Sequence, residues 1–538
     1  MKTILPLLLS AALLPRFYPD DPIVVDNDRL PIAKPEPIEL SATYDLLENT
    51  FAQDPPARPI PRAMNVNTLG EVPDSSWFTN RIGMKEMSIE ELSRGPDIGG
   101  PPDTARPIII VSAKRSGITP GFTVRDARGN VYFLKFDPRE HPNLSTGADV
   151  ISKNFFHAIG YNVPEAYIVY LNAELLEIGP LATIALPGGK TAPMDREYLR
   201  FMLENAARGP DGNVRAVASL LVPGEVIGPF EFYGTRPDDP NDIFPHEHRR
   251  ELRGYRVFAS WLNHDDCRAI NTLDTFITNG EDGGYLRHYL IDFGSTLGSG
   301  SDYLQRIAPQ DPRGGNEYLI DLESIWKAAY TFGVWDRAWR SVEYPYPRYA
   351  EVGRIEADFF EPRRWKPEYP NRAFDHMLAD DAFWAAKIVA RFTDEAIRGI
   401  VKTGDYLSKE AANYLADTLI RRRDKVVSYY FGRLNPLDAF HVEGRELVFT
   451  NLGEESGLAA VEAYEYEWFV FDNESGARNP VGSQGETRSA RIAIPESAAD
   501  YLMARIYTRT PGQPLWGLAV DVTIRNGAVI GIDREIPE

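Results

Sequence analysis

The sequence predicts a mixed α+β fold with two lobes followed by a β-sandwich, on three observations. Strand-like runs rich in β-branched and aromatic residues dominate residues 105–238. Apolar stripes at helical spacing dominate residues 239–436, and short strand-like runs between turn residues fill 437–538. We therefore expect a β-rich first lobe, a helical second lobe and a C-terminal sandwich.

Size and composition are those of an ordinary globular protein. The 538 residues, 43% hydrophobic and 25% charged, are enough for two to four domains. The net charge of −20 is spread along the chain, which argues against nucleic-acid or anionic-membrane binding. The single cysteine, Cys267, excludes an internal disulfide, and we expect a small buried residue rather than a catalytic thiol.

The N-terminus carries Lys2 and an apolar run, Ile4 to Leu14. This run is too short to span a bilayer as a helix, so no transmembrane helix is predicted, but it fits the hydrophobic part of a secretory signal. Residues 1–16 are therefore a possible signal segment, and we expect export to a bacterial periplasm or the extracellular space. A buried N-terminal helix in a cytoplasmic protein is the alternative.

Residues 17–104 are rich in proline and acidic residues. Such a segment buries little apolar area, so we expect an extended arm that follows a surface, with Trp77 and Phe78 as its anchors.

The predicted first lobe begins with strands at 108–111 and 131–137. Gly117 and Gly121 lie between these strands, and glycines allow the close backbone approach that phosphates require. Lys135 lies among aromatic and aliphatic residues on the second strand. It points either to solvent or to a buried anion.

A helix is predicted from Thr146 to Ile159, with apolar residues at spacing four and Gly160 at its end. Asp149 lies in its predicted first turn, where it serves either a site or the positive end of the helix.

Three further elements are expected before residue 264: a helix at 195–208, a strand at 214–222 and a helix at 244–262. The proline- and acid-rich stretch 237–242 is the predicted hinge between the lobes. His246 and His248 lie on different helix faces, so we expect a solvated helix entry rather than a metal pair.

The central motif has two parts. The first runs from His264 through Asp266 to Asn271, and the second is Asp292-Phe293-Gly294 after an apolar run. Phosphoryl transfer needs a carboxylate to orient the attacking hydroxyl, and a carbonyl oxygen and a second carboxylate to hold Mg²⁺ against the phosphates. Asp266, Asn271 and Asp292 supply these groups in that order.

These motifs resemble the catalytic and magnesium loops of the protein-kinase-like superfamily, over about residues 110–430. The run from Gly147 to Glu165 is similar to the equivalent helix and turn of HipA-type kinases, which carry glutamate where Asp149 stands. Arg268 replaces the lysine that is usual in kinases. No Ala-Pro-Glu follows the loop at 295–316, unlike in eukaryotic protein kinases.

The resemblance implies a kinase-like fold and an ATP- and Mg²⁺-dependent phosphotransferase. Lys135 would grip the phosphates with Asp149 orienting it, and Gly117 and Gly121 would approach them. Asp266 would position the acceptor hydroxyl, and Arg268 would neutralise charge on the transferred group. Asn271 and Asp292 would bind Mg²⁺, and His264 would brace the loop through hydrogen bonds. The phosphoryl acceptor would be a hydroxyl group of a protein or a small molecule, and the sequence does not identify which.

Helices are expected after this loop at 319–332, 380–391, 394–403 and 409–431. Thr393 is a predicted N-cap, and Arg421 to Arg423 a predicted exposed turn. In the last hundred residues the aromatic stripe Tyr464, Tyr466 and Trp468 should be sheet core, and Asn526-Gly527 predicts a hairpin.

Three other functions stay open: a nucleotide-binding pseudokinase or scaffold acting through its sandwich, transfer of a nucleotide rather than a phosphate, and a metal-dependent hydrolase. The hydrolase would use His246, His248, His264 and Asp265, whose spacing is irregular.

Overall fold

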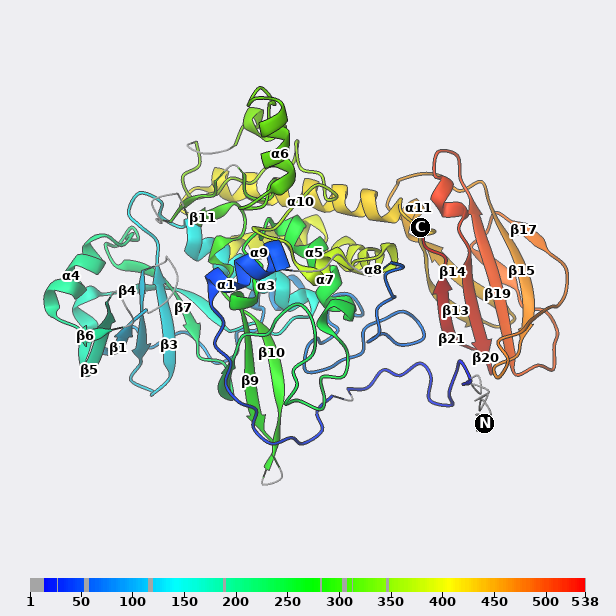
Figure 1. Cartoon of the computed structure of the whole chain (residues 1–538), viewed down its shortest axis with the longest axis horizontal. Helices are drawn as coiled ribbons and strands as arrows, with labels where there is room; N and C mark the ends of the chain where they lie inside the picture. Colours follow the sequence, from blue (N-terminus) through cyan, green and yellow to red (C-terminus); the bar gives the residue numbers. More distant parts are fainter. Residues whose placement is uncertain are drawn as a thin grey trace, which may run out of the picture. The chain divides into compact units, whose positions relative to one another are not determined.

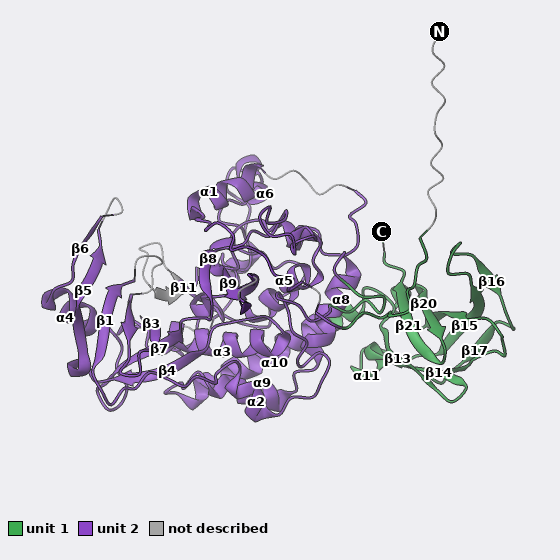
Figure 2. Cartoon of the chain, turned by 90° about the horizontal axis from the view of Figure 1, so that it is seen from below, with its two compact units in different colours: residues 1–24, 66–72, 428–538 green, residues 25–65, 73–427 purple. Residues whose placement is uncertain are grey.

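The computed structural model describes residues 14–26, 28–52, 58–114, 120–186, 190–280, 283–301, 307–311, 313–344 and 348–537. The chain forms two compact units (Figure 2). The smaller unit contains residues 1–24, 66–72 and 428–538, and the larger contains 25–65 and 73–427. The predicted segment boundaries at 16, 104, 238 and 436 stay predictions.

The larger unit contains a seven-stranded sheet in the order β4-β7-β3-β2-β1-β5-β6 (Figure 1). Neighbouring strands are antiparallel except β1 and β5, which are parallel. The strands are β1 Ile108–Ala113, β2 Gly121–Arg125, β3 Val131–Phe136, β4 Ala166–Leu171, β5 Leu176–Ala185, β6 Thr191–Pro193 and β7 Val214–Leu220. The strands predicted at 108–111, 131–137 and 214–222 are thus confirmed.

Side-chain alternation along β3 separates the core from the candidate site. Tyr132, Leu134 and Phe136 all belong to one buried apolar core. Because successive side chains of a strand point to opposite faces, Lys135 lies on the other face of the sheet. A turn closed by Asp126, whose Oδ1 accepts hydrogen bonds from the backbone of Arg128 and Asn130, fixes the β2–β3 register.

Helix α3, Leu144–Ile159, confirms the helix predicted from Thr146. All its residues except His157 are buried, and Gly160 ends it with φ of 144°. A Cβ atom at Gly160 would lie 2.2 Å from the Phe78 ring, so only glycine fits. The helix begins two residues earlier than predicted, which moves Asp149 from the first turn to the second. Its expected role at the helix N-terminus is therefore wrong, because the dipole acts mainly in the first turn.

A second, three-stranded sheet follows in the order β10-β9-β8. Its strands are β8 Glu225–Gly228, β9 Thr272–Thr278 and β10 Gly284–Leu290, and a two-stranded pair comes next, β11 Ser299–Ser301 and β12 Ile307–Pro309. The chain passes from the large sheet to this sheet at residues 221–224, before the predicted hinge at 237–242. The side chain of Asp242 accepts from Arg236 N (2.7 Å) and Arg249 Nη2 (3.1 Å).

Helix α5, Arg250–Leu262, is shorter than the helix predicted from Phe244, because His246–His248 form a separate 3-10 turn. The expected solvated entry is also wrong. His246 is 4% exposed, and its Nε2 lies 2.8 Å from Asp242 Oδ2. This buried pair ties the turn to the preceding loop.

Short helices and most of one long helix, as far as Val427, complete the larger unit. Thr393 caps its helix as predicted, with its hydroxyl accepting from Ala396 N. The helices are α1 Ala42–Leu47, the π-helix η1 Glu48–Ala52, α2 Ile89–Arg94, α4 Arg196–Glu204, α6 Leu322–Tyr330, α7 Arg372–Asp375, α8 Ala379–Ala390, α9 Asp394–Lys402 and α10 Lys409–Phe431. The described residues of this unit also contain the 3-10 turns η2 Ala173–Leu175, η4 His246–His248, η5 Ala269–Asn271, η7 Phe293–Ser295 and η8 Ala338–Ser341.

The arginine run on α10, predicted as an exposed turn, is exposed only at Arg421, whereas Arg423 is half-buried and Arg422 is buried. Arg422 is 3% exposed and donates hydrogen bonds to the carbonyl oxygens of Trp261, Ser260 and Glu356. Its guanidinium therefore satisfies C-terminal carbonyls of α5, just before the central motif begins.

The smaller unit contains two antiparallel sheets, β13-β14-β18 and β16-β15-β19-β20-β21, with β17 also paired to β15. A shared apolar core takes side chains from both sheets, including Tyr464 and Trp468, with Tyr466 packed against it, as predicted. The elements are β13 Leu437–Glu443, β14 Glu446–Asn451, α11 Leu452–Glu455, β15 Ala463–Phe471, β16 Arg478–Pro480, β17 Gly485–Thr487, β18 Arg491–Ala493, β19 Tyr501–Arg509, η9 Pro514–Gly517, β20 Val520–Arg525 and β21 Ala528–Arg534.

Two local predictions in the remaining segments are confirmed. Asn526 and Gly527 have φ of 53° and 73° and join antiparallel β20 and β21, as a two-residue hairpin requires. Trp77 and Phe78 are 4% and 0% exposed, and Trp77 stacks on His288 with ring centroids 3.5 Å apart. The segment around them is thus anchored by buried aromatic rings.

The mixed α+β class is confirmed, with a large sheet and many helices, whereas the kinase-like lobes and the sandwich stay predictions. Among the described residues, no helix combines the length and the apolar character needed to cross a membrane. Residues 1–13, which hold most of the predicted signal segment, lie outside the described part of the chain.

Candidate functional site

Lys135 on β3 links two carboxylates that are far apart in the sequence. It is 8% exposed, so the solvent-facing alternative is wrong. Its Nζ donates to Asp149 Oδ2 on α3 at 2.9 Å and to Asp292 Oδ1 at 2.8 Å. Burial opposes the charge of Lys135, but the two carboxylates outweigh burial and raise its pKa. The lysine is therefore positive at neutral pH.

Asp292 follows β10 in a conformation that few non-glycine residues adopt. Its φ and ψ are 60° and 69°, in the left-handed region, which costs on the order of 1–2 kcal/mol. Burial works against its ionisation, yet the charges of Lys135 and Lys114 lower its pKa. Gly294 follows in a close-packed position, where a Cβ atom would lie 2.6 Å from Ser145 Oγ and would force that side chain to move. The surrounding structure thus keeps an ionised carboxylate in a strained position.

Asp266 lies in the loop between α5 and η5 and pairs with Arg268. Arg268 also reaches Glu368, with Nη1 3.3 Å from Oε2. Ser295 Oγ donates to Asp266 Oδ2 at 3.3 Å, which ties this loop to the segment that follows Asp292. Burial raises the pKa of Asp266, while Arg268 opposes the rise. Burial and the charge of Asp266 raise the pKa of Glu368 to about 7.

Asn271 at the end of η5 is held next to Asp292 by the backbone. Its side-chain Nδ2 donates to the backbone oxygen of Asp266 at 2.7 Å, and its backbone carbonyl oxygen accepts from the backbone N–H of Ile291 at 3.0 Å. With Nδ2 engaged, the side-chain oxygen of Asn271 stays available. That oxygen and the Asp292 carboxylate are two hard oxygen ligands of the kind that Mg²⁺ prefers.

Of the two glycines predicted to approach phosphates, the structure describes only Gly121. Gly117 lies outside the described residues. Gly121 pairs with Lys135 across β2 and β3, and a Cβ atom there would lie 2.0 Å from Leu134 O. The structure therefore explains Gly121 by close strand pairing. A direct role with a phosphate is not needed to account for it.

Two neighbours of Asp266 are buried, and their chemistry follows from that burial. Desolvation lowers the pKa of His264 to about 3, so its ring is neutral. The ring packs against Phe293 and Phe156, with centroids 5.9 Å away in each case, and among the described residues its Nδ1 has no partner. The expected bracing by hydrogen bonds is thus wrong, and the bracing comes from packing. Cys267 is 4% exposed, and burial raises its pKa well above the ordinary value, which confirms an inert thiol.

Lys114, directly after β1, belongs to the site and was missed by the sequence reasoning. Its charge acts on Asp292, Lys135 and Asp149, and burial lowers its pKa. The signal was present in the sequence as a lysine at the entry to the glycine-containing loop. The strand was expected to end at 111, however, so the sequence did not predict the strand pairing that places Lys114 in line with Lys135.

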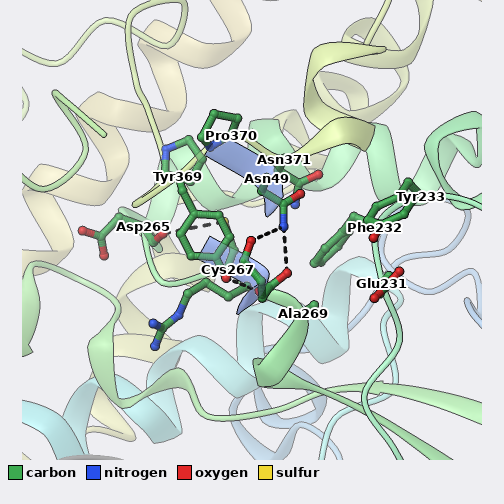
Figure 3. A pocket seen from close by; sticks show the side chains of 13 residues that line it. Asn49, Glu231, Phe232, Tyr233, Asp265, Cys267, Ala269, Tyr369, Pro370 and Asn371 are labelled. Carbon is green, nitrogen blue, oxygen red and sulfur yellow. Dashed lines mark hydrogen bonds between the residues drawn. The ribbon is translucent and has the colours of Figure 1, made fainter. Parts of the chain in front are cut away.

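A small cavity lies beside the loop that carries Asp266 and is lined by its neighbours Asp265 and Cys267 (Figure 3). Asp45 on α1 borders it and accepts hydrogen bonds from Asn49 Nδ2 (2.7 Å) and the Tyr369 hydroxyl. The segment at 42–52, part of the predicted arm, therefore borders the loop. The cavity is lined by Asp45, Asn49, Glu231, Phe232, Tyr233, Asp265, Cys267, Arg268, Ala269, Pro367, Tyr369, Pro370 and Asn371.

The metal-dependent hydrolase gains no support. In the described part of the chain, no three His, Cys, Asp or Glu side chains gather in a way that could hold a metal ion. His246 is paired with Asp242, and His248 Nδ1 lies 2.7 Å from Arg253 Nη2. His246, His248, His264 and Asp265 thus do not form a shared site.

Comparison with known proteins adds one distant similarity. No family model and no curated protein matches the chain. Among solved structures, the chain is similar to the crystal structure of a Helicobacter pylori proinflammatory kinase, CtkA, at 10% identity. The match covers 60% of this chain and 98% of that one, with a TM-score of 0.26. A score this low does not establish a shared fold, so the function must be argued from the site itself.

Proposed function

We propose that the chain is an ATP- and Mg²⁺-dependent phosphotransferase, an atypical kinase that acts on a protein or small-molecule hydroxyl. The observation that carries the proposal is the contact of Lys135 Nζ with both Asp149 and Asp292. Three segments separated by up to 157 residues thereby meet at one ammonium group. A structural ion pair needs one partner, whereas a phosphate-gripping lysine needs an orienting acid and a nearby metal ligand.

The donor set fits a magnesium–nucleotide complex. Asp292 and Asn271 offer two oxygen ligands, and Mg²⁺ in such sites takes one or two carboxylates and completes its shell with phosphate oxygens and water. The metal would neutralise charge on the phosphates. The ammonium group of Lys135 would contact the phosphate chain in place of part of its contact with Asp292. Asp149 would keep the Lys135 ammonium group in position.

The reaction would be a displacement at the γ-phosphorus. The acceptor hydroxyl oxygen forms a bond to that phosphorus while the bond to the β–γ bridging oxygen breaks, and ADP leaves. Asp266 orients the hydroxyl and accepts its proton late in the step. Arg268, now paired with Asp266, offers a guanidinium to the charge on the transferred group.

On this proposal the seven-stranded sheet is the β-rich lobe of a two-lobed kinase-like fold, and helices such as α5, α8 and α10 belong to the second lobe. The two sheets of the smaller unit form the sandwich. A branch resembling HipA-type kinases, and export through residues 1–16, complete the proposal. Lys135, Asp149 and the Asp292 motif support it, because they occupy strand, helix and loop positions in the expected order.

A pseudokinase is the second candidate, and one observation favours it. Arg268 pairs directly with Asp266, so the carboxylate that should orient the acceptor is already engaged. In such a scaffold the nucleotide would bind without turnover, and the smaller unit would carry the function. Binding of Mg-ATP without transfer to any acceptor, the chain itself included, would support this reading.

The test incubates the full chain with Mg-ATP labelled separately at the γ- and α-phosphates and follows modification by intact mass. We expect γ-label to be transferred, and transfer of α-label would mean nucleotidyl transfer instead. Asp292→Asn should reduce transfer by about a hundredfold or more, because a metal ligand is lost.

The matched control is Asp417→Asn, which removes an exposed carboxylate of α10 that forms a surface ion pair with Arg398. Its transfer rate should equal that of the unaltered chain. If Asp292→Asn transfers phosphate at the unaltered rate, the assignment of the site is wrong.

A further inference from the structure

The strand register aligns two lysines on one face of the large sheet. Gly121 is paired with Lys135 across β2 and β3, and Ala113 with Phe122 across β1 and β2. The next residue, Lys114, donates its backbone N–H to Gly121 O at 3.0 Å. Lys114, Gly121 and Lys135 therefore form one row across three adjacent strands.

Residues that lie opposite each other on neighbouring strands point to the same face of a sheet. Ala113 and Phe122 both belong to the apolar core on the other face, which confirms that Lys114 and Lys135 lie away from that core. Gly121 between them has no side chain. The two lysine backbones are thus about 10 Å apart, two strand spacings.

The two lysines of this row differ in their direct partners. Lys135 has two carboxylate partners, Asp149 and Asp292. Lys114 acts on the same carboxylates through space, but within the described residues its ammonium makes no hydrogen bond or ion pair. A partly buried ammonium without a direct partner, aimed at the face where Lys135 lies, is suited to bind an anion from outside the chain.

We propose that Lys114 is a second phosphate-binding residue, and that the phosphate chain of the nucleotide bridges the ammonium groups of Lys114 and Lys135. The inference deepens the proposed function and rests on it. It also specifies the ligand: a polyphosphate can engage both cations, whereas a monophosphate can engage only one and a nucleoside, which has no phosphate, engages neither. The site should therefore discriminate strongly by phosphate number.

The test measures binding of Mg-ATP, AMP and adenosine to the full-length protein by calorimetry. Lys114→Met should weaken Mg-ATP binding about tenfold to a hundredfold, as expected when a charge-assisted hydrogen bond is lost. Adenosine binding should not change. Lys114→Arg, which keeps the charge, should restore most of the affinity for Mg-ATP.

The control is Lys190→Met, which removes an exposed lysine next to β6 of the same sheet and should leave all three affinities unchanged. Equal melting temperatures verify folding. If Lys114→Met does not fold, Lys114→Gln provides the same comparison with a polar side chain of similar length.

The outcomes separate this inference from the function it rests on. If Lys114→Met binds Mg-ATP normally while Asp292→Asn does not, Lys114 is not a phosphate ligand and the phosphotransferase proposal stands. Equal losses for Mg-ATP and adenosine would mean a purely structural role for Lys114 and would overturn the inference. If the unaltered chain binds no Mg-ATP, both proposals are wrong.

Discussion

At the scale of single residues, the candidate site consists of charges that burial would penalise if they were alone. Lys135 stays positive because the charges of Asp149 and Asp292 raise its pKa. Asp292 stays negative because the charges of Lys135 and Lys114 lower its pKa. Around Asp266 the balance is different, since Asp266 and Glu368 share one guanidinium, that of Arg268. Lys135 and Asp292 therefore stay ionised, whereas the pair of Asp266 and Glu368 can bind a proton.

Glu368 should make stability depend on pH in a defined direction. Its pKa in the folded chain is raised from 4.5 to about 7, so between these values the folded state binds more protons than the unfolded state. The free energy of unfolding must then fall as pH rises through this window. Relative to Glu368→Gln, the unaltered chain should lose on the order of 1–3 kcal/mol between pH 5 and pH 8, measured by urea unfolding.

Glu361→Gln is the control, because Glu361 is exposed and pairs with Arg364 at the surface. It should follow the pH profile of the unaltered chain. A difference between the unaltered chain and Glu368→Gln that grows in favour of the unaltered chain with rising pH would contradict the prediction.

At the scale of elements, the site depends on how β2, β3 and α3 are held together. The pairing of β2 with β3 is close at Gly121, and α3 is buried along nearly its whole length. The helix carries Asp149 and the strand carries Lys135, so any shift between them would separate the ion pair. Rigid elements of this kind position charged groups more accurately than loops do.

Gly121→Ala should therefore reduce both stability and nucleotide binding. The added Cβ atom would lie 2.0 Å from Leu134 O, a backbone atom that cannot move without disturbing β3. We expect a loss of about 2 kcal/mol or more in urea unfolding, as for other overpacked sites, and weaker Mg-ATP binding because Lys135 moves.

Gly517→Ala makes the same chemical change where no atom lies within 4 Å of the added Cβ. It should alter stability by less than about 1 kcal/mol. Equal effects of the two substitutions would show that the β2–β3 contact is not the cause.

At the scale of the whole molecule, segments from opposite ends of the sequence pack within one unit. Phe17 is 3% exposed and contacts Phe471 and Tyr501, with ring centroids 5.8 and 6.2 Å away. Asn473 fixes the same segment by donating from Nδ2 to Phe17 O at 2.8 Å. Residues just after the predicted signal segment therefore complete the core of the smaller unit.

Phe17→Ala should destabilise the smaller unit by about 3–5 kcal/mol, because a large buried ring is lost and a cavity remains. Leu14→Ala, three residues earlier and 79% exposed, should change stability by less than about 0.5 kcal/mol. Urea unfolding of the three full-length proteins tests both values. A small effect of Phe17→Ala would mean that the N-terminal segment is dispensable for this unit.

Much of the local structure was predictable because it depends on neighbours in the sequence. Apolar spacing identified α3 and α10, and Asn526-Gly527 identified a hairpin. The errors arose where distant groups decide the outcome. Arg422 looks exposed by sequence, but carbonyl oxygens at the end of α5 bind it. His246 looks like a solvated residue, but Asp242 holds it in the interior.

The sequence by itself determined the mixed α+β class, the strand that carries Lys135 and the order of the Asp266, Asn271 and Asp292 motifs, since periodicity and spacing are local properties. Only the tertiary structure decided that Lys135 contacts both Asp149 and Asp292, that Arg268 engages Asp266, and that Lys114 joins the row. Contacts and pKa values depend on burial and on charges contributed by distant segments, and no pattern along the chain encodes those distances.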